Sequence, residues 1–461
     1  MIKAFKNEKK LVYLQKNLNQ YVMKRLFGMV LSLTVLTASA QTTERASVLT
    51  SGTTAREEIN QNPWLAGSNY LDYDRQLPDF NYTKAPKGYV PFYFTHYGRH
   101  GSRWLIGKDD YERVLRPLRK ADAQGKLTKE GKDVLEKLEK FNKTTYKRLG
   151  DLTTVGERQH HGIGKRIAQH FPEIFLTKNL AIDARSTTVN RCILSMIAEC
   201  EELMAANPTA RIHNDVSESL QYYLNKEHEG KVKEANKHID WKKVNEYNDS
   251  KTHPNRLMKV LFNDEKWAAD SVNQGSLMRN LFEIVTNMQS HDDGSDMMSL
   301  FTEDERYDLW CISNLSWYLR YANSPMTDNA KPFSQYNLLK NIIETADTCV
   351  ALRKPQATMR FGHEVCVLPL ACLMELGNSN ASIEDIYELD KHWQNYKIFP
   401  MGCNIQLIFY KPKKGNGDIL VKALLNEREV TLPVKATTTP YYYKWSDLRQ
   451  YWTKKLERFE N

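Results

Sequence analysis

The 461-residue sequence contains no low-complexity tract, no heptad run and no repeat of fixed period. These absences exclude fibrous proteins, coiled coils and repeat solenoids, all of which need periodic sequences. Hydrophobic residues make up 41% and charged residues 26% of the chain, as in ordinary soluble globular proteins. A chain of this length can bury a sizeable core, and we expect it to form more than one domain.

Cysteine patterns that bind metals or form redox pairs are also missing. Because the number of cysteines is odd they cannot all pair within one chain, and the sequence does not determine which of them would pair in an oxidising compartment. We expect most of them to be small, buried apolar groups. The seven cysteines form no CxxC pair and no metal-ligand spacing, and they are Cys192, Cys200, Cys311, Cys349, Cys366, Cys372 and Cys403.

The chain has no apolar run long enough to span a membrane. The apolar stretch near its beginning, Leu26–Leu36, is too short to cross a bilayer, and no cysteine directly follows it to carry a lipid anchor. Instead, Met23-Lys24-Arg25 precedes this stretch and the A-x-A-like site 38–40 follows it, which together predict a secretory signal. We therefore expect residues 1–40 to be removed, with 1–22 a possible upstream extension, and the mature protein to be periplasmic or extracellular.

A global excess of positive charge is missing once this segment is removed. Residues 1–40 hold seven Lys and Arg against one Glu, a net +6, which leaves +3 of the formal +9 for the rest of the chain. A nucleic-acid-binding protein is therefore not indicated. Any preference for anions must come from a local cluster.

Strand patterns alternate with helical patterns along the rest of the chain. This alternation predicts an α/β fold, with a mixed sheet flanked by helices. A stretch rich in Lys, Glu and Asn, almost without β-branched runs, predicts an inserted, mainly helical second domain over 217–330, between sheet-domain parts 41–216 and 331–461. The expected strands are 89–95, 179–184, 357–361, 403–410 and 418–425, and the expected helices are 109–120, 129–148, 152–171, 190–206, 337–352, 365–376 and 442–459.

Positive charge is concentrated directly after the first expected strand. The segment GYVPFYFTHYGRHGSRW brings Arg99, His100 and Arg103 together, with Gly98 and Gly101 allowing tight turns. In α/β sheets ligands bind beyond the carboxyl ends of strands, and forked guanidiniums suit phosphate oxygens. A neutral imidazole between them could attack phosphorus. The alternative is that the arginines pair with carboxylates and that the histidine is a packed loop residue.

Three further stretches follow in order along the chain, LTTVGERQHHGIGKR (152–166), RSTTVNR (185–191) and MRFGHEV (359–365). Together with RHGSRW they resemble the histidine acid phosphatases, branch 2 of the histidine phosphatase superfamily. RHGSRW is similar to the family's RHGxRxP, RSTTVNR to its RSTxVDR, and HE to its HD or HAE pair. The resemblance covers roughly 89–376, and its details are most like the multiple inositol polyphosphate phosphatases, which dephosphorylate phytate.

The resemblance implies a division of roles among six residues. His100 would attack phosphorus and become a phosphohistidine, and Glu364 would protonate the leaving alkoxide and then help water hydrolyse the intermediate. No metal or organic cofactor is implied, and the implied ligand is a small phosphorylated molecule. Arg185 is expected to be structural. The phosphoryl oxygens would be held by Arg99, Arg103, Arg191 and His363.

This chain departs from the family pattern at three places. Trp104 and Leu105 replace the proline segment, Asn190 replaces an acidic residue, and Glu364 directly follows the histidine instead of lying one residue later, at Val365. The alternatives therefore stay open between a phytate phosphatase, a general acid or sugar phosphatase, and a phosphate-binding protein without catalysis. The oligomeric state is not predicted.

Three further histidines are expected to have no catalytic role. His160 and His161 are adjacent on an expected helix, so their side chains diverge by about 100° and cannot easily chelate one metal. His96 is expected to be a core histidine with a satisfied hydrogen bond.

Overall fold

The computed structural model describes residues 53–225 and 230–460. The predicted signal segment, 1–40, lies outside the described residues. Within the described ranges, no helix combines the length and apolarity that a membrane crossing requires.

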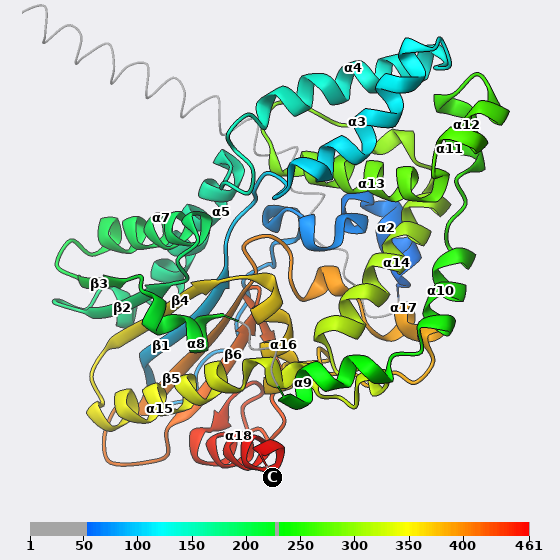
Figure 1. The fold of residues 1–461 in the computed structure, drawn as a ribbon. Helices are drawn as coiled ribbons and strands as arrows, with labels where there is room; N and C mark the ends of the chain where they lie inside the picture. The colour runs from blue at the N-terminus through cyan, green and yellow to red at the C-terminus, as the bar shows by residue number, and fades with distance from the viewer. Residues whose placement is uncertain (1–52, 226–229, 461) are drawn as a thin grey trace, which may run out of the picture. The chain divides into compact units, whose positions relative to one another are not determined.

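An eight-stranded mixed sheet forms the centre of the described chain (Figure 1). The strand order is β3-β2-β4-β1-β5-β6-β7, and β8 pairs with β6. Strands β1 to β4 run parallel, while β5 to β8 are antiparallel to their neighbours, which confirms the predicted mixed sheet. The strands are β1 Tyr89–Arg99, β2 Ala181–Ser186, β3 Arg211–Asp215, β4 Gln356–Gly362, β5 Asn404–Pro412, β6 Leu420–Leu425, β7 Arg428–Val430 and β8 Tyr443–Lys444.

Helices cover both faces of this sheet. Alternate side chains of a strand point to opposite faces, so β1 contributes to two cores. Phe94 packs in the core under α5 Thr154–His170, α6 Pro172–Phe175 and α7 Asn190–Ala206. Tyr93 and Tyr97 pack in the core under α15 Tyr336–Leu352, α16 Glu364–Met374 and α18 Trp445–Glu460.

A layer of helices continues the second core. Residues 217–330 contain helices and no strand among the positions described. Helices from before this segment join the layer, because α2 packs on α14, α3 on α13 and α4 on α11. The predicted domain boundaries stay a prediction. The layer comprises α2 Ala55–Gln61, α3 Lys108–Ala123, α4 Lys129–Thr144, α10 Trp241–Ser250, α11 Asn255–Leu261, α12 Glu265–Ser271, α13 Gln274–Asn287 and α14 Glu303–Tyr321.

Short helical turns connect these elements. Three are α-helical: α8 Gln221–Leu224, α9 Gly230–Glu234 and α17 Leu389–His392. The 3-10 turns are η1 Pro63–Tyr70, η2 Tyr73–Gln76, η3 Glu218–Leu220, η4 Ala235–His238, η5 Met288–Ser290, η6 Met298–Leu300, η7 Pro325–Thr327, η8 Lys331–Gln335, η9 Ile386–Glu388 and η10 Asn395–Lys397.

Element ends differ from the sequence predictions in ways that matter for function. Strand β1 continues to Arg99 rather than ending at residue 95, so the charged motif begins on the strand itself. Helix α5 is capped by Thr153, whose hydroxyl accepts a hydrogen bond from the Gly156 amide. The helix predicted over 129–148 ends at Thr144, which leaves 145–153 as a connecting loop. All seven cysteines are buried free thiols.

Candidate active site

The sheet topology brings the separate motifs to one place. Strands β1 and β4 are parallel neighbours, with Arg99 opposite Gly362, so His100 and His363 both follow a carboxyl end at the same edge. Helix α7 begins beside them, since the Cys192 thiol donates a hydrogen bond to the Gly362 carbonyl across 3.1 Å. The six residues that the resemblance implied therefore converge.

Close backbone packing fixes the loop that carries His100. A Cβ added to Gly101 would lie 2.3 Å from the Gly156 carbonyl oxygen, so this approach requires glycine. Ser195 on α7 accepts a hydrogen bond from the Gly101 amide at 3.1 Å, and Gln159 on α5 accepts one from the Ser102 amide at 2.9 Å. Sequence reasoning missed these two supporting residues; their signal is a polar side chain on a helix face that is otherwise apolar.

His100 has a defined tautomer. Its Nδ1 lies 2.8 Å from the Gly101 carbonyl oxygen, which can only accept, so Nδ1 carries the proton. The buried Nε2 has no hydrogen-bond partner among the described residues and lies 3.7 Å from a carboxylate oxygen of Glu364. Burial, followed by the charges of Arg99 and Arg191, lowers the pKa of His100 well below its usual value. The imidazole is therefore neutral, with its Nε2 lone pair available to a ligand.

The guanidinium groups are anchored through backbone carbonyls. Arg99 Nη1 donates to the carbonyls of Asn69 at 2.7 Å and Phe399 at 3.1 Å. Arg103 donates to the Trp104 carbonyl at 2.9 Å, and Arg191 donates to the Gly150 carbonyl at 3.2 Å. Carbonyl anchoring holds each cation in place without neutralising its charge.

Several donors of these groups remain unused. Within the described ranges, Arg99 Nη2, Arg103 Nε and Arg191 Nε are buried without a hydrogen-bond partner. Buried polar groups normally have partners, so such a cluster points to a ligand. The alternative that both motif arginines pair with carboxylates is wrong, because only Arg99 does so in the part of the chain that is described. Burial, followed by the charge of Arg103, lowers even the pKa of Arg191.

His363 and Glu364 complete the cluster. The rings of His100 and His363 lie 5.6 Å apart, and His363 Nε2 is 3.4 Å from the Thr187 hydroxyl. Burial, together with the arginine charges, lowers the pKa of His363 to about 4. Burial alone would raise the pKa of Glu364, but the charges of Arg99 and Arg103 outweigh it and lower this pKa to about 2. Glu364 is therefore ionised in this structure.

The Glu364 carboxylate lies between the nucleophile and the first arginine. One oxygen is 3.0 Å from Arg99 Nε and 3.7 Å from His100 Nε2. Ligand atoms of His100, His363 and Glu364 also lie within 4.8 Å of one another, close enough to hold a cation. Three surrounding guanidiniums repel a cation at this place, so the electrostatics favour an anion.

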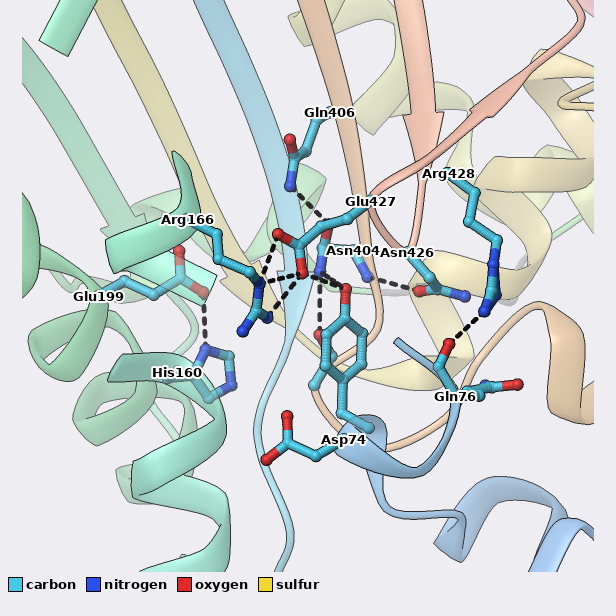
Figure 2. Close-up of polar contacts among 12 residues, drawn as sticks. Asp74, Gln76, His160, Arg166, Glu199, Asn404, Gln406, Asn426, Glu427 and Arg428 are labelled. Atoms are coloured by element: carbon cyan, nitrogen blue, oxygen red, sulfur yellow. Dashed lines mark hydrogen bonds and ion pairs between the residues drawn. The ribbon is translucent and has the colours of Figure 1, made fainter. Parts of the chain in front are cut away.

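A buried polar network around Asn404 and Glu427 (Figure 2) is connected to the nucleophile loop. The Gly402 amide donates to the His100 carbonyl at 3.0 Å, and Asn404 donates to the Gly402 carbonyl at 3.2 Å and to the Tyr73 hydroxyl at 3.0 Å. The Tyr73 hydroxyl donates to Glu427 at 3.0 Å. The loop after residue 398 thereby holds the nucleophile loop.

The histidines that were expected to have no catalytic role are not part of the cluster formed by His100, His363 and Glu364. His160 is buried and its Nδ1 is 2.7 Å from a Glu199 oxygen, a packing role as expected. His96 is buried as expected, and its Nε2 lies 3.9 Å from a Glu199 oxygen. Arg185 pairs with Asp183 at 2.8 Å, in keeping with a structural role.

Three arginines, a second histidine and one carboxylate thus surround a nucleophilic nitrogen, as in a phosphoryl-transfer site. The model of the histidine phosphatase superfamily (branch 2) matches residues 98–426. The chain therefore belongs to this superfamily, and it is a phosphatase. The comparison with curated protein sequences gave no match.

Solved structures of related enzymes share the fold. The multiple inositol polyphosphate phosphatase of Bifidobacterium longum, in complex with inositol hexasulfate, has a TM-score of 0.66 at 18% identity, covering 84% of this chain and 97% of that one. Its apo form has a TM-score of 0.68 at 18% identity, covering 83% and 96%. The phytase from D. castellii has a TM-score of 0.63 at 13% identity, covering 85% of each chain.

Proposed function

We propose that this protein is an exported phosphomonoesterase that hydrolyses inositol polyphosphates such as phytate through a phosphohistidine at His100. The observation that carries the proposal is the state of this histidine. Its Nε2 is unprotonated, buried and without a hydrogen-bond partner among the described residues, beside guanidinium groups with unused donors.

In the first step, His100 Nε2 attacks phosphorus while the bond from phosphorus to the leaving oxygen breaks. Arg99, Arg103 and Arg191 offset the negative charge of the transferring group, and His363 adds a further polar contact. The leaving alkoxide takes a proton from Glu364. An alkoxide is a poor leaving group, so such help contributes about 10²- to 10⁴-fold.

Protonation of Glu364 requires the substrate. With its pKa lowered to about 2 by Arg99 and Arg103, the carboxylate has no proton to give at neutral pH. A bound phosphate offsets these two charges and raises the pKa of Glu364, so the acid forms when it is needed. In the second step Glu364 takes a proton from water, whose oxygen attacks phosphorus and releases His100.

The substrate class is supported by the structural relatives. The related B. longum enzyme is named an inositol polyphosphate phosphatase and is seen with inositol hexasulfate. A general acid phosphatase or sugar phosphatase is the second candidate, because Glu364 directly follows His363 and so begins helix α16. A phosphate-binding protein without catalysis is less well supported, since nucleophile and acid are both present.

Export is supported by the signal-like pattern of residues 1–40. Expression in a bacterial host, fractionation and N-terminal sequencing test this part. We expect a mature chain in the periplasm or medium that begins at Gln41. A chain that stays in the cytoplasm with its first 40 residues intact would contradict it.

A substrate panel tests the activity. Phytate, glucose 1-phosphate and an aryl phosphate are supplied in turn, and the inositol products are separated by chromatography. We expect phytate to have the highest kcat/KM. A preference for glucose 1-phosphate would favour the second candidate, and phosphate binding without release from any substrate would contradict catalysis.

A further inference from the structure

A small polar cavity lies between the sheet and helix α15. Met359 and Phe361 of β4 pack in the core under α5 and α7. Thr358 and Arg360 alternate with them along the strand, so they point to the other face of the sheet, toward α15. The cavity there has a volume of about 50 Å³, and none of the described residues that line it belongs to the catalytic cluster. Its polar lining residues are Asp183, Arg185, Asn341, Thr345, Thr358 and Arg360.

Arg360 brings a buried positive charge to this cavity. The residue is only 3% exposed, and within the described chain the hydrogen-bond acceptors around its guanidinium are neutral. Nε and Nη2 donate to the Asn341 side-chain oxygen at 3.0 and 2.9 Å, and Nη1 donates to the Thr95 hydroxyl at 2.9 Å. Longer hydrogen bonds reach Thr345 at 3.2 Å and Thr358 at 3.3 Å. These contacts satisfy the donors of Arg360 but leave its charge uncompensated.

The lining of the cavity carries one positive charge in excess. Asp183, the only carboxylate among the described lining residues, forms an ion pair with Arg185 Nε at 2.8 Å. Asp183 also lies 3.3 Å from His213 Nδ1. The charges of Arg185 and Asp183 therefore cancel, and Arg360 is left without a counter-charge. An uncompensated buried charge strongly destabilises a folded protein.

The size and charge of the cavity define its ligand. A single negative charge balances Arg360, and hydroxyl, amide and guanidinium groups of the lining can donate hydrogen bonds to it. One water molecule occupies roughly 30 Å³ in the liquid, so a cavity of about 50 Å³ holds an ion of chloride's size but not a phosphorylated ring. We propose that the cavity binds one small monovalent inorganic anion, of chloride's size, against Arg360.

The bound anion joins the sheet to a helix. Arg185 lies on β2, Arg360 on β4 and Asn341 on α15, so an ion held by these three side chains connects the two strands to α15. A ligand that binds only the folded chain raises its stability. Anion binding therefore stabilises this face of the sheet, and it is independent of the proposed phosphatase activity.

Thermal unfolding of the full chain in chloride tests the site. Gluconate, which is too large for the cavity, replaces chloride at constant ionic strength. We expect the Tm to rise by about 2–5 °C as chloride reaches saturation, because the ion binds the folded chain and not the unfolded one.

Asn341→Asp is the matched variant. Its carboxylate takes the place of the oxygen that accepts from Nε and Nη2 of Arg360, so the variant supplies the missing negative charge itself. We expect a higher Tm than that of the wild type in gluconate and no further rise in chloride, an outcome that a folding defect cannot produce. Thr348→Asp makes the same change of charge at an exposed position of α15, and this control should keep the wild-type response to chloride.

Bromide locates the ion, because chloride can also reach the catalytic arginines. Crystals grown in bromide should show an anomalous-scattering peak in the cavity beside Arg360, and this peak should be absent in Asn341→Asp. Three results would overturn the proposal: a wild-type cavity without a peak, a peak confined to the catalytic cluster, or the same chloride response in the wild type and Asn341→Asp. Phosphatase activity enters neither measurement, so a failure of the proposed function would not change the outcome.

Discussion

The protein buries two arginine–glutamate pairs whose surroundings differ. Arg166 donates to Glu427 from both Nε and Nη2, and Tyr73 donates to the same carboxylate. In the other pair, Arg99 Nε and a Glu364 oxygen are 3.0 Å apart without hydrogen-bond alignment. Both carboxylates are almost fully buried.

The two pairs differ in how many buried polar atoms remain without a hydrogen-bond partner. Among the described residues, Glu427 and Tyr73 leave no buried polar atom without a partner, whereas Arg99, His100 and Glu364 all do. A buried ion pair whose polar atoms are all hydrogen-bonded stabilises one arrangement of the fold. A pair with unused donors and charge can bind a ligand. Burial of charge alone would not have distinguished structure from site.

Replacing the arginine of each pair should have the largest effects and should separate activity from stability. Arg99→Met removes a guanidinium from the phosphoryl site, and we expect kcat/KM to fall about 10³-fold or more, as for arginines that offset charge in phosphoryl transfer. Arg166→Met leaves Glu427 buried and unpaired, so the free energy of unfolding should fall by about 3 kcal/mol. Steady-state kinetics and urea unfolding measure both variants. Equal losses of activity in the folded proteins would contradict the distinction.

The two carboxylates can be compared in the same way. Glu364→Gln keeps the shape but cannot donate a carboxylic proton, so kcat on an alkyl phosphate should fall about 10²- to 10⁴-fold. An aryl phosphate, with its better leaving group, should be slowed less. Inorganic phosphate should bind more tightly, because no carboxylate charge competes for Arg99. Equal slowing of both substrates would move the acid role to another residue, and Glu427→Gln serves as the control for stability.

Acid should destabilise the site specifically. His363 has a pKa of about 4 when folded against an ordinary 6.5, so the unfolded chain takes up its proton first as the pH falls. The stability it contributes above pH 6.5 is therefore lost between pH 6.5 and 4, by about 2–3 kcal/mol at pH 4.5. Urea unfolding should show a smaller loss for His363→Asn than for the wild type, whereas exposed His392→Asn should follow the wild type. Identical pH profiles for His363→Asn and the wild type would contradict the shift.

Supporting residues give the smallest effects. Ser195→Ala leaves the Gly101 amide buried and unpaired, which should cost about 1–3 kcal/mol of stability and lower kcat several-fold by loosening the His100 loop. Ser379 is also buried, but its hydroxyl donates to the Ala371 carbonyl, outside the nucleophile loop. Ser379→Ala should lower the free energy of unfolding without changing kcat. An unchanged kcat for Ser195→Ala would show that its contact does not position His100.

Local sequence predicted the parts of the site that are local. The segment GYVPFYFTHYGRHGSRW combines a strand pattern, glycines and positive charge, and this combination predicted the position of His100. Thr153 and Thr154 predicted the cap at the start of α5. The parallel pairing of β1 with β4 brings in His363 and Glu364, and this depends on contacts far apart in sequence. It was expected only through the family resemblance.

Other features left weaker signals. Strand β3 is five residues with only one apolar side chain, so its pattern does not stand out. Helices α3 and α4 pack on α13 and α11. All of these helices are amphipathic, so their sequences do not indicate which helix packs on which. Ser195 and Gln159 became recognisable only once their helices were seen against the Gly101 loop.

Trapping the intermediate tests the central claim most directly. The enzyme is mixed with a phosphorus-labelled substrate, quenched within milliseconds in alkaline denaturant, digested and analysed by mass spectrometry. We predict an alkali-stable, acid-labile phosphoryl group on Nε2 of His100, and no label in His100→Ala. Label on His363 or another residue, or turnover by His100→Ala at the wild-type rate, would contradict the assignment.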